Sequence, residues 1–285
     1  MKLLEYDFMR RALMAAVLIG LAAPAVGIYL VQRRLSLIGD GLGHVALAGV
    51  ALGILTGTAP VWVALVVAVA GALTVELVRS KGHASGDIAL AILFYGGIAG
   101  GVVLISQAPG GTPSNLNSYL FGAITTTTRA DVATFAVLTV VVVGLTVGLR
   151  RFLFAVSNDE EYALASGMPV LRLNLLLAVL TAVTVVVSMR VVGLLLVSAL
   201  MIVPVATAQA LTRSFAATMA AAMTIGVAVS VGGVATSFYT DTPSGGTIIL
   251  LAIACFAAAN FAQATRGIIR TRRTGREGRA GGSPP

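Results

Sequence analysis

The sequence predicts an all-α integral membrane protein with about nine transmembrane helices, and two observations lead to this fold class. Of the 285 residues, 58% are hydrophobic and only 11% are charged, with a mean hydropathy of +0.97. Soluble domains have roughly a quarter of their residues charged, so this composition excludes a water-soluble protein. The chain also contains several charge-free runs as long as the roughly 20 residues that a helix needs to cross a bilayer core.

The charge-free runs divide into nine predicted spans, at about 10–31, 37–56, 60–79, 87–106, 131–151, 173–189, 191–211, 215–237 and 245–264. Gly57 and Pro60 separate the second span from the third. Pro204 lies inside the seventh span, where it must kink or break the helix and free a backbone carbonyl. Such a site is either a moving, cavity-lining element or ordinary architecture. The spans form one polytopic domain over 1–265, and the basic tail over 266–285 is predicted to be disordered.

The formal net charge of +8 fits a membrane protein with basic loops on one side. No basic face is interleaved with aromatic residues, which argues against nucleic-acid binding. With the C-terminus in the cytoplasm, 14 of the 19 Lys and Arg residues fall on the inner side, as the positive-inside rule requires. The weakest point of this orientation is the pair Arg10 and Arg11, which falls on the outer side. The single cysteine, Cys255, excludes a disulfide within the chain.

Two ionisable residues inside the second span are the first functional candidates. Asp40 and His44 are four residues apart, so on a helix they lie on one face, one turn apart. A carboxylate and an imidazole at that spacing can bind one divalent cation, and both suit zinc, manganese and iron(II). Counted from Arg34, His44 lies about 15 Å deep, close to the midplane. The alternative is that Asp40 is an interfacial residue and His44 a hydrogen-bonded packing residue.

The segment 157–169 is the only dense acidic cluster, and it lies in the longest internal loop of the predicted inner side. Asn158 or Asp159 can cap a short helix with acids in its first turn, and Gly167 followed by Pro169 ends it. We therefore expect a compact surface helix of about two turns. It is either a docking element for a cytoplasmic partner or a solvated connector. At the inner end of the third span, Glu76 is expected to pair with Arg79.

The chain resembles the metal ABC-transporter permeases, the membrane subunits of bacterial zinc, manganese and iron(II) importers. The likeness runs in the same order through Leu37–Gly53, Asp87, Leu116–Gly122, Asp159–Pro169, Val192–Val197 and Pro204–Ala208. Family members typically have Ser where this chain has Gly43, and Pro where it has Ala48. Together these segments cover most of residues 10–265, which is more specific than any one motif.

The resemblance implies a type II importer architecture in the bacterial plasma membrane. Two permease subunits, expected as a homodimer, would enclose one translocation path, with a cytoplasmic ABC ATPase dimer below and an extracytoplasmic metal-binding protein above. The permease itself would not be an enzyme and would hold no permanent cofactor; the metal is its cargo, with zinc placed first and manganese or iron(II) as the alternatives. The chain has no G-x-x-x-x-G-K-[ST] phosphate loop, which agrees with a separate ATPase.

The resemblance also assigns roles to residues. Asp40 and His44 match the intramembrane metal ligands of the family, and Pro204 lies in a segment expected to take part in gating. The residues that match the helix coupled to the ATPase are Asp159, Glu160, Glu161, Tyr162, Ala163, Ala165, Gly167 and Pro169. Two other functions stay open: a secondary metal carrier driven by proton exchange at Asp40 and His44, and a membrane metalloenzyme. The second is weakened because the chain has only two histidines, whereas catalytic zinc sites usually need three protein ligands.

Overall fold

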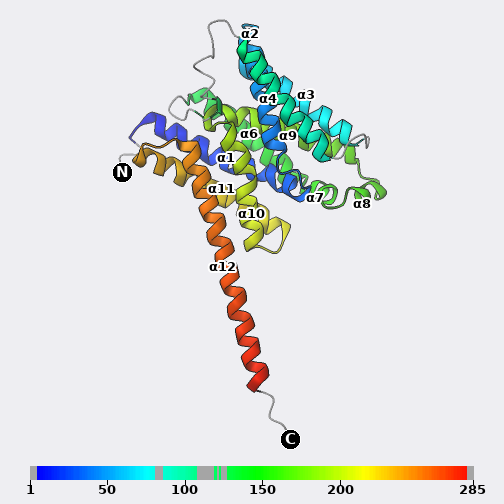
Figure 1. Cartoon of the computed structure of the whole chain (residues 1–285), viewed down its shortest axis with the longest axis vertical. Coiled ribbons are helices and arrows are strands. Elements are labelled where there is room, and N and C mark those ends of the chain that lie inside the picture. Colours follow the sequence, from blue (N-terminus) through cyan, green and yellow to red (C-terminus); the bar gives the residue numbers. More distant parts are fainter. Residues whose placement is uncertain (1–4, 81–85, 108–118, 121, 123–126, 281–285) are drawn as a thin grey trace.

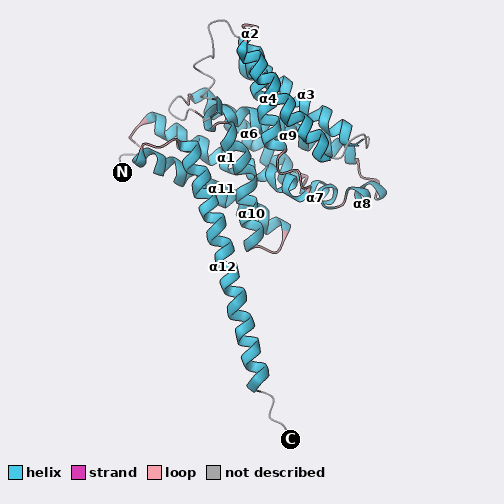
Figure 2. Ribbon diagram, in the orientation of Figure 1, coloured by secondary structure: helices cyan, strands magenta, loops and turns pink. Residues whose placement is uncertain are grey.

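The computed structural model describes residues 5–80, 86–107, 119–120, 122 and 127–280, and its described elements are all helices (Figures 1 and 2). The side chains at 86, 87, 190, 191, 195, 264 and 266–280 lie outside that description. In chain order the helices are α1 (Asp7–Gln32), α2 (Ile38–Leu55), α3 (Pro60–Ser80), α4 (Gly86–Ser106), α6 (Arg129–Gly148), α7 (Arg150–Asn158), α8 (Glu160–Ala165), α9 (Val170–Val192), α10 (Leu194–Leu211), α11 (Phe215–Thr240) and α12 (Ser244–Ala280).

All nine predicted spans coincide with long helices, and the predicted fold class is confirmed. Eight helices are long and apolar enough to cross a membrane, and the ninth contains a shorter apolar stretch, Leu196–Leu211 in α10. α10 continues through Pro204 without a break, so of the two outcomes expected at that residue the structure excludes the broken helix. The interruption lies instead at Gly193, whose φ of 84° separates α9 from α10.

Two elements differ from the expectation. The segment after 148, expected to finish the fifth span and then run as a loop, forms the separate helix α7, which buries Leu153, Val156 and Ser157 at helical spacing. The sequence did not predict α7, because Arg150 and Arg151 are typical of the end of a span and interrupt its apolar pattern. α12 continues as a helix to Ala280, through the part of the tail for which we expected no regular structure, and projects away from the other helices (Figure 1).

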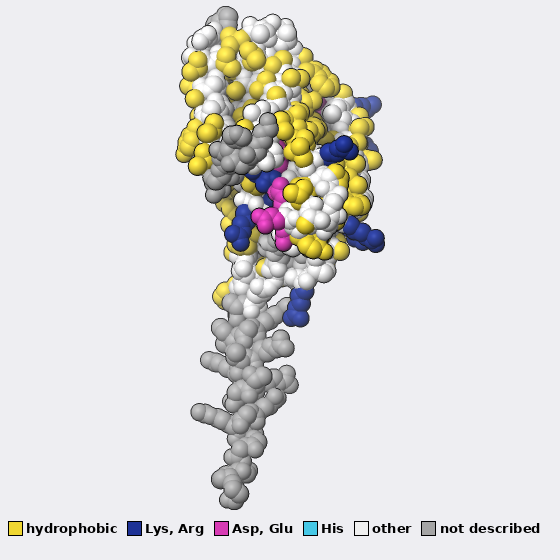
Figure 3. Space-filling model, turned by 90° about the vertical axis from the view of Figure 1, so that its right-hand side faces the viewer, with side chains coloured by type: hydrophobic (Ala, Val, Ile, Leu, Met, Phe, Trp, Pro, Cys, Tyr) yellow, Lys and Arg dark blue, Asp and Glu magenta, His cyan; other side chains and the backbone are white. Residues whose placement is uncertain are grey.

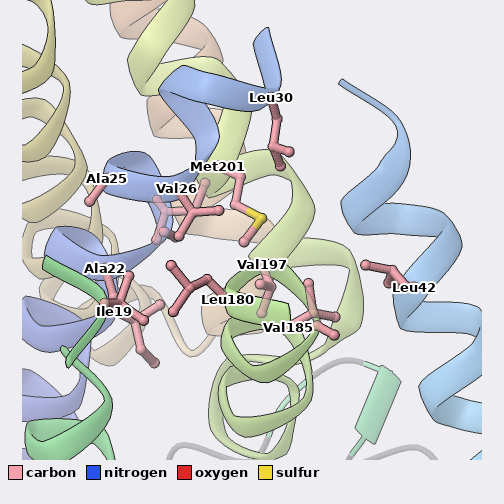
Figure 4. Packing of buried hydrophobic residues seen from close by; sticks show 14 of the residues in the cluster. Ile19, Ala22, Ala25, Val26, Leu30, Leu42, Leu180, Val185, Val197 and Met201 are labelled. Carbon is pink, nitrogen blue, oxygen red and sulfur yellow. The ribbon is translucent and has the colours of Figure 1, made fainter. Parts of the chain in front are cut away.

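The helices form two groups that α9 joins. In one group α2 packs between α3 and α4; in the other α1 packs against α6, α10 and α11, and α12 covers α10 and α11. α9 contacts α3 and α2 on one side and α10 and α1 on the other. Figure 4 shows this junction, where Ile19 and Val26 of α1 face Leu180 of α9 and Met201 of α10. The buried core therefore runs through both groups, and α1, α9 and α10 meet at the junction between them.

Close crossings between helices depend on glycine. α1 and α11 meet at Gly20 and Gly226, where a Cβ on Gly20 would lie 2.8 Å from the carbonyl oxygen of Gly226. No side chain fits between these two backbones, so the helices pack at a distance that only small residues allow. α1 and α6 run in parallel. Thr139 donates a hydrogen bond of 3.1 Å to the carbonyl of Leu18 near the middle of the pair, and Tyr29 donates one of 2.6 Å to the carbonyl of Thr146 near its C-terminal end.

Candidate metal site and coupling helix

Asp40 and His44 lie in the first two turns of α2, whose N-terminus is on the side of the molecule that carries α8. The chain turns sharply before α2, with Arg34 at a φ of 60°, and the helix begins at Ile38. Asp40 is therefore in the first turn, where a carboxylate is stabilised by the free N–H groups and the dipole of the helix. His44 follows one turn later, and its ring makes an edge contact with Phe94 of α4 at 4.9 Å between centroids.

The other faces of α2 are filled by neighbouring helices. The face at Gly39 and Gly43 packs against α10, the face at Gly41 packs against α4, and the face at Gly49 packs against Ala64 of α3. Asp40 and His44 fall on the remaining strip, between α4 and α10, and both are only half-buried. The two candidate ligands thus share the one face of α2 that the described part of the chain leaves partly open.

The depth of this face follows from the helices beside it. Measured from the first residue of α2, His44 is only about 9 Å along the helix, because the four residues after Arg33 form a turn rather than helix. The next residue, Val45, contacts Gly71 and Gly97, which lie within one residue of the centres of α3 and α4. His44 is therefore level with the middle of two 21-residue helices, although it is close to the start of its own.

Asp40 and His44 do not form a complete metal site with any other side chain in the described part of the chain. Within the described residues, no three side chains of His, Cys, Asp or Glu gather closely enough to hold a metal ion. The carboxylate of Asp40 has no hydrogen bond or ion pair with any described residue. A charged group left in a membrane helix without a partner is costly. The pair therefore provides two donor groups that are free to bind a ligand but are too few to enclose one.

Gly43, one of the two departures from the family pattern, lies between the candidate ligands. A Cβ at this position would overlap Cδ1 of Leu194, the first residue of α10. Leu194 is fully buried, so it occupies the space into which a serine side chain at position 43 would point. At the other departure, Ala48 contacts Gly101 of α4. α2 is an unbroken helix at this residue.

The acidic segment forms the expected short helix. Asp159 is its N-cap, and its Oδ1 accepts a hydrogen bond of 2.9 Å from the backbone N–H of Tyr162. Gly167, at a φ of 76°, ends the helix, and the N–H of Met168 donates to the carbonyl of Ala163. Ala163 is fully buried, whereas the exposed side chains of this segment are Asn158, Asp159, Glu161, Tyr162, Leu164, Ala165, Ser166 and Pro169.

The exposed surface around α8 combines acids with large apolar side chains. Tyr162 and Leu164 are 66% and 67% exposed, and Phe152 of the neighbouring α7 is 49% exposed. Figure 3 views the molecule from this side and shows the acidic side chains gathered beside hydrophobic ones, with arginines around them. Exposed aromatic and aliphatic side chains outside the spans are the kind of surface that binds a protein partner.

A cluster of four charged residues ties α8 to the membrane helices. Glu76 of α3 is 3% exposed and accepts hydrogen bonds from Arg79 at 2.7 Å and from Arg33 at 3.4 Å. Glu160, the first residue of α8, lies 2.9 Å from Arg79 and 3.9 Å from Arg33. Asn174 of α9 donates a further hydrogen bond of 3.0 Å to Glu160. We call Arg33, Glu76, Arg79 and Glu160 the charge cluster.

The charge cluster sets the protonation of Glu160. Burial acts to raise the pKa of this carboxyl group, but the hydrogen bond from Arg79 and the charges of Arg79 and Arg33 outweigh it, so the pKa lies below its ordinary value. Glu160 therefore stays charged at neutral pH. The pairing of Glu76 with Arg79 was predicted from their spacing; the contributions of Arg33 and Glu160 were not, because these residues are 43 and 81 positions from their partners.

Some of the segments singled out in the sequence fall outside the described residues. They are the side chain of Asp87 and most of Leu116–Gly122. Gln32 of α1 donates a hydrogen bond of 3.0 Å to Asn158 of α7, a second link between the end of α1 and the segment that carries α8. That link joins residues 126 positions apart and had no local signal in the sequence.

Comparison with known proteins gives a family and a fold. Residues 5–263 match the ABC 3 transport family. The chain is 30% identical over 268 residues to a manganese transport system membrane protein, MntC, of Halalkalibacterium halodurans, covering 94% of this chain and 91% of that one. It is 31% identical over 256 residues to a probable iron transport system membrane protein of Haemophilus influenzae, covering 90% and 94%.

A solved structure supports the same assignment. PsaBC from Streptococcus pneumoniae, in complex with a Fab, superposes with a TM-score of 0.79 at 30% identity, covering 90% of this chain and 92% of that chain. The match extends over nearly all of the described helices, so it concerns the whole architecture and not one motif. The chain therefore belongs to the ABC 3 transport family, and it is a multi-pass membrane permease of the metal ABC-transporter class that its sequence resembles.

Proposed function

We propose that this chain is one of two identical permease subunits of an ATP-driven importer of a divalent metal, and that Asp40 and His44 bind the ion in transit. One observation carries the proposal: a carboxylate and an imidazole share the partly open face of α2, level with the middle of α3 and α4. Both groups are good ligands for a divalent ion, and such residues inside a membrane usually face an ion path.

The incomplete site favours a second copy of the chain across this face. Two protein ligands leave most of the shell of a divalent ion to water, whereas a copy related by twofold symmetry would contribute another carboxylate and another imidazole. Four donors of this kind can hold the ion for long enough to replace its water. The half-buried strip of α2 between α4 and α10 would then become the wall of a path between the two subunits.

Manganese is the first candidate for the cargo. The relatives reported above are named for manganese and for iron, so we place manganese first and iron(II) second. Zinc, the first candidate from the sequence, becomes the third. A site of two carboxylates and two imidazoles contains no thiolate, and oxygen ligands suit manganese. The site chemistry alone accepts all three ions, so the order rests on the relatives.

The surface around α8 is the proposed docking site for the cytoplasmic ATPase. Tyr162 and Leu164 would contact the ATPase, and the charge cluster would carry a movement of α8 into the membrane. Glu160 binds Arg79 at the end of α3, and α3 packs closely on α2, where Gly49 lies against Ala64. A shift of α8 would therefore reach the helix that holds Asp40 and His44 through two rigid contacts.

This docking also fixes the proposed orientation in the plasma membrane. If α8 faces the cytoplasm, the ends of α1 and α6 at Asp7 and Arg129 face outward, where an extracytoplasmic metal-binding protein would deliver the ion. The C-terminal part of α12 would lie on the cytoplasmic side, as its many arginines favour. Alternating access would then move the ion from the outer end of the path, past Asp40 and His44, to the α8 end.

The test is metal content in metal-starved bacteria with and without the gene, measured for manganese, iron and zinc by mass spectrometry. We expect a selective fall in manganese on deletion, restored by the wild-type gene and by Glu5→Gln, an exposed control, but not by Asp40→Asn or His44→Ala. Normal uptake by both variants, at equal membrane levels, would overturn the ligand assignment. Transport by the purified chain alone in liposomes with a pH gradient would instead establish the secondary carrier.

A further inference from the structure

The end of the molecule opposite α8 contains a pocket rich in arginine. It lies between the first turns of α1 and α6 and has a volume of about 240 Å³. The residues that line it are Asp7, Arg10, Arg11, Met14, Arg129 and Val132. Three guanidinium groups thus face one carboxylate, and two helix N-termini add to the positive potential. We call this the arginine pocket.

The charges of the arginine pocket are not balanced within the described chain. Arg10 lies 4.0 Å from Asp7, and both side chains are well exposed, so this pair accounts for the only acid in the pocket lining. Arg11 and Arg129 have no ion pair with any described residue. The Nε of Arg11 is buried and has no hydrogen-bond partner among the described residues. A buried donor on a cation is costly unless an acceptor reaches it.

The position of the pocket indicates the class of ligand. α1 and α6 are parallel, apolar and long enough to span the membrane, so their first turns lie at the level of the lipid headgroups. Met14, which is 48% exposed, and Val132 lie next to the arginines on the side toward the membrane interior. A cationic rim above an apolar wall fits a phosphate with an attached acyl chain better than it fits a free anion.

We propose that the arginine pocket binds the phosphodiester of an anionic phospholipid, held by Arg11 and Arg129, with the acyl chain along Met14 and Val132. Planar guanidinium groups match phosphate oxygens with two parallel hydrogen bonds. The excess of two positive charges favours an anionic headgroup over a zwitterionic one. The ligand also accounts for Arg10 and Arg11 at the end of α1 where the positive-inside rule disfavours them.

The test compares thermal unfolding of the detergent-purified chain with and without phosphatidylglycerol, and counts retained lipids by native mass spectrometry. We expect saturating phosphatidylglycerol to raise the Tm of the wild type by about 5 °C. Arg11→Gln and Arg129→Gln should each weaken the lipid affinity about tenfold. Arg11→Lys should keep part of the effect, and Arg151→Gln, an exposed arginine at the α8 end, should keep all of it.

Each other outcome contradicts the proposal in a distinct way. An equal effect of inorganic phosphate would make the site one for a free anion, and an equal effect of phosphatidylcholine would remove the preference for charge. An unchanged lipid response in both glutamine variants would exclude the pocket as the lipid site. Variants that respond normally to lipid but no longer bind an extracytoplasmic partner would assign the arginines to protein docking. The assay needs no transport, so it is independent of the metal proposal.

Discussion

The charge cluster and the Asp40–His44 pair use similar side chains in opposite ways. In the cluster, two arginines and two glutamates from three parts of the chain bind one another, and Glu76 is almost completely buried. On α2, a carboxylate at the start of the helix has no charged partner among the described residues and lies on a half-buried face. Paired charges therefore link the helices at the cluster, whereas the carboxylate on α2 has no described partner, which is why we propose it as a ligand.

The largest expected effect concerns Glu76. Glu76→Gln removes the charge that two arginines share and leaves Arg33, whose side chain is 6% exposed, short of a partner. Removing one member of a buried charge pair costs about 3–5 kcal/mol of stability. We expect a large fall in Tm in thermal unfolding of the purified chain. The double variant Arg33→Leu with Glu76→Leu should recover much of the loss; if it is no more stable than Glu76→Gln, the cluster does not act through paired charge.

Asp40 should respond in the opposite manner. Asp40→Asn keeps the volume of the side chain and breaks no ion pair, so the free energy of unfolding should change by no more than about 0.5 kcal/mol. Metal affinity should fall at least about 100-fold, because loss even of the groups that support a ligand costs 10–100-fold. Calorimetric titration of the purified chain with manganese measures this, with Glu161→Gln as the control. A strongly destabilised Asp40→Asn would mean that Asp40 is structural.

The smallest expected effect concerns how the ion pairs of Glu160 change the Tm as the pH is lowered. The pKa of Glu160 in the folded chain is below its ordinary value of 4.5, so its ion pairs stabilise the protein fully above that value. This stabilisation is lost as the pH falls through the lowered pKa. The Tm difference between the wild type and Glu160→Gln should therefore be constant from about pH 8 to about pH 5 and shrink below about pH 4. A difference that grows toward acid pH would contradict the role of the charged carboxylate.

The spans and α8 could be predicted from sequence because their signals are local. Long charge-free runs mark the spans, and the cap at Asp159 and the stop at Gly167 mark α8 within nine residues. The charge cluster could not be predicted as a whole, because Arg33 and Glu160 reach α3 only after the chain folds. The gap between the first two spans predicted the turn before α2, but not its sharpness, because nothing in the neighbours of Arg34 signals its left-handed φ.

The contact between Leu194 and Gly43 has a consequence for biosynthesis. Leu194 packs against α2 at Gly43, on the face next to the two candidate ligands, but it is translated 150 residues after His44. At about 5–20 residues per second, the ribosome needs roughly 8–30 s to reach it. During that interval α2 is already in the membrane, but the surface at Gly43, next to Asp40 and His44, is not yet covered by Leu194. The geometry of the pair is therefore completed late, when α10 enters the membrane, and a nascent chain that stalls before then lacks it.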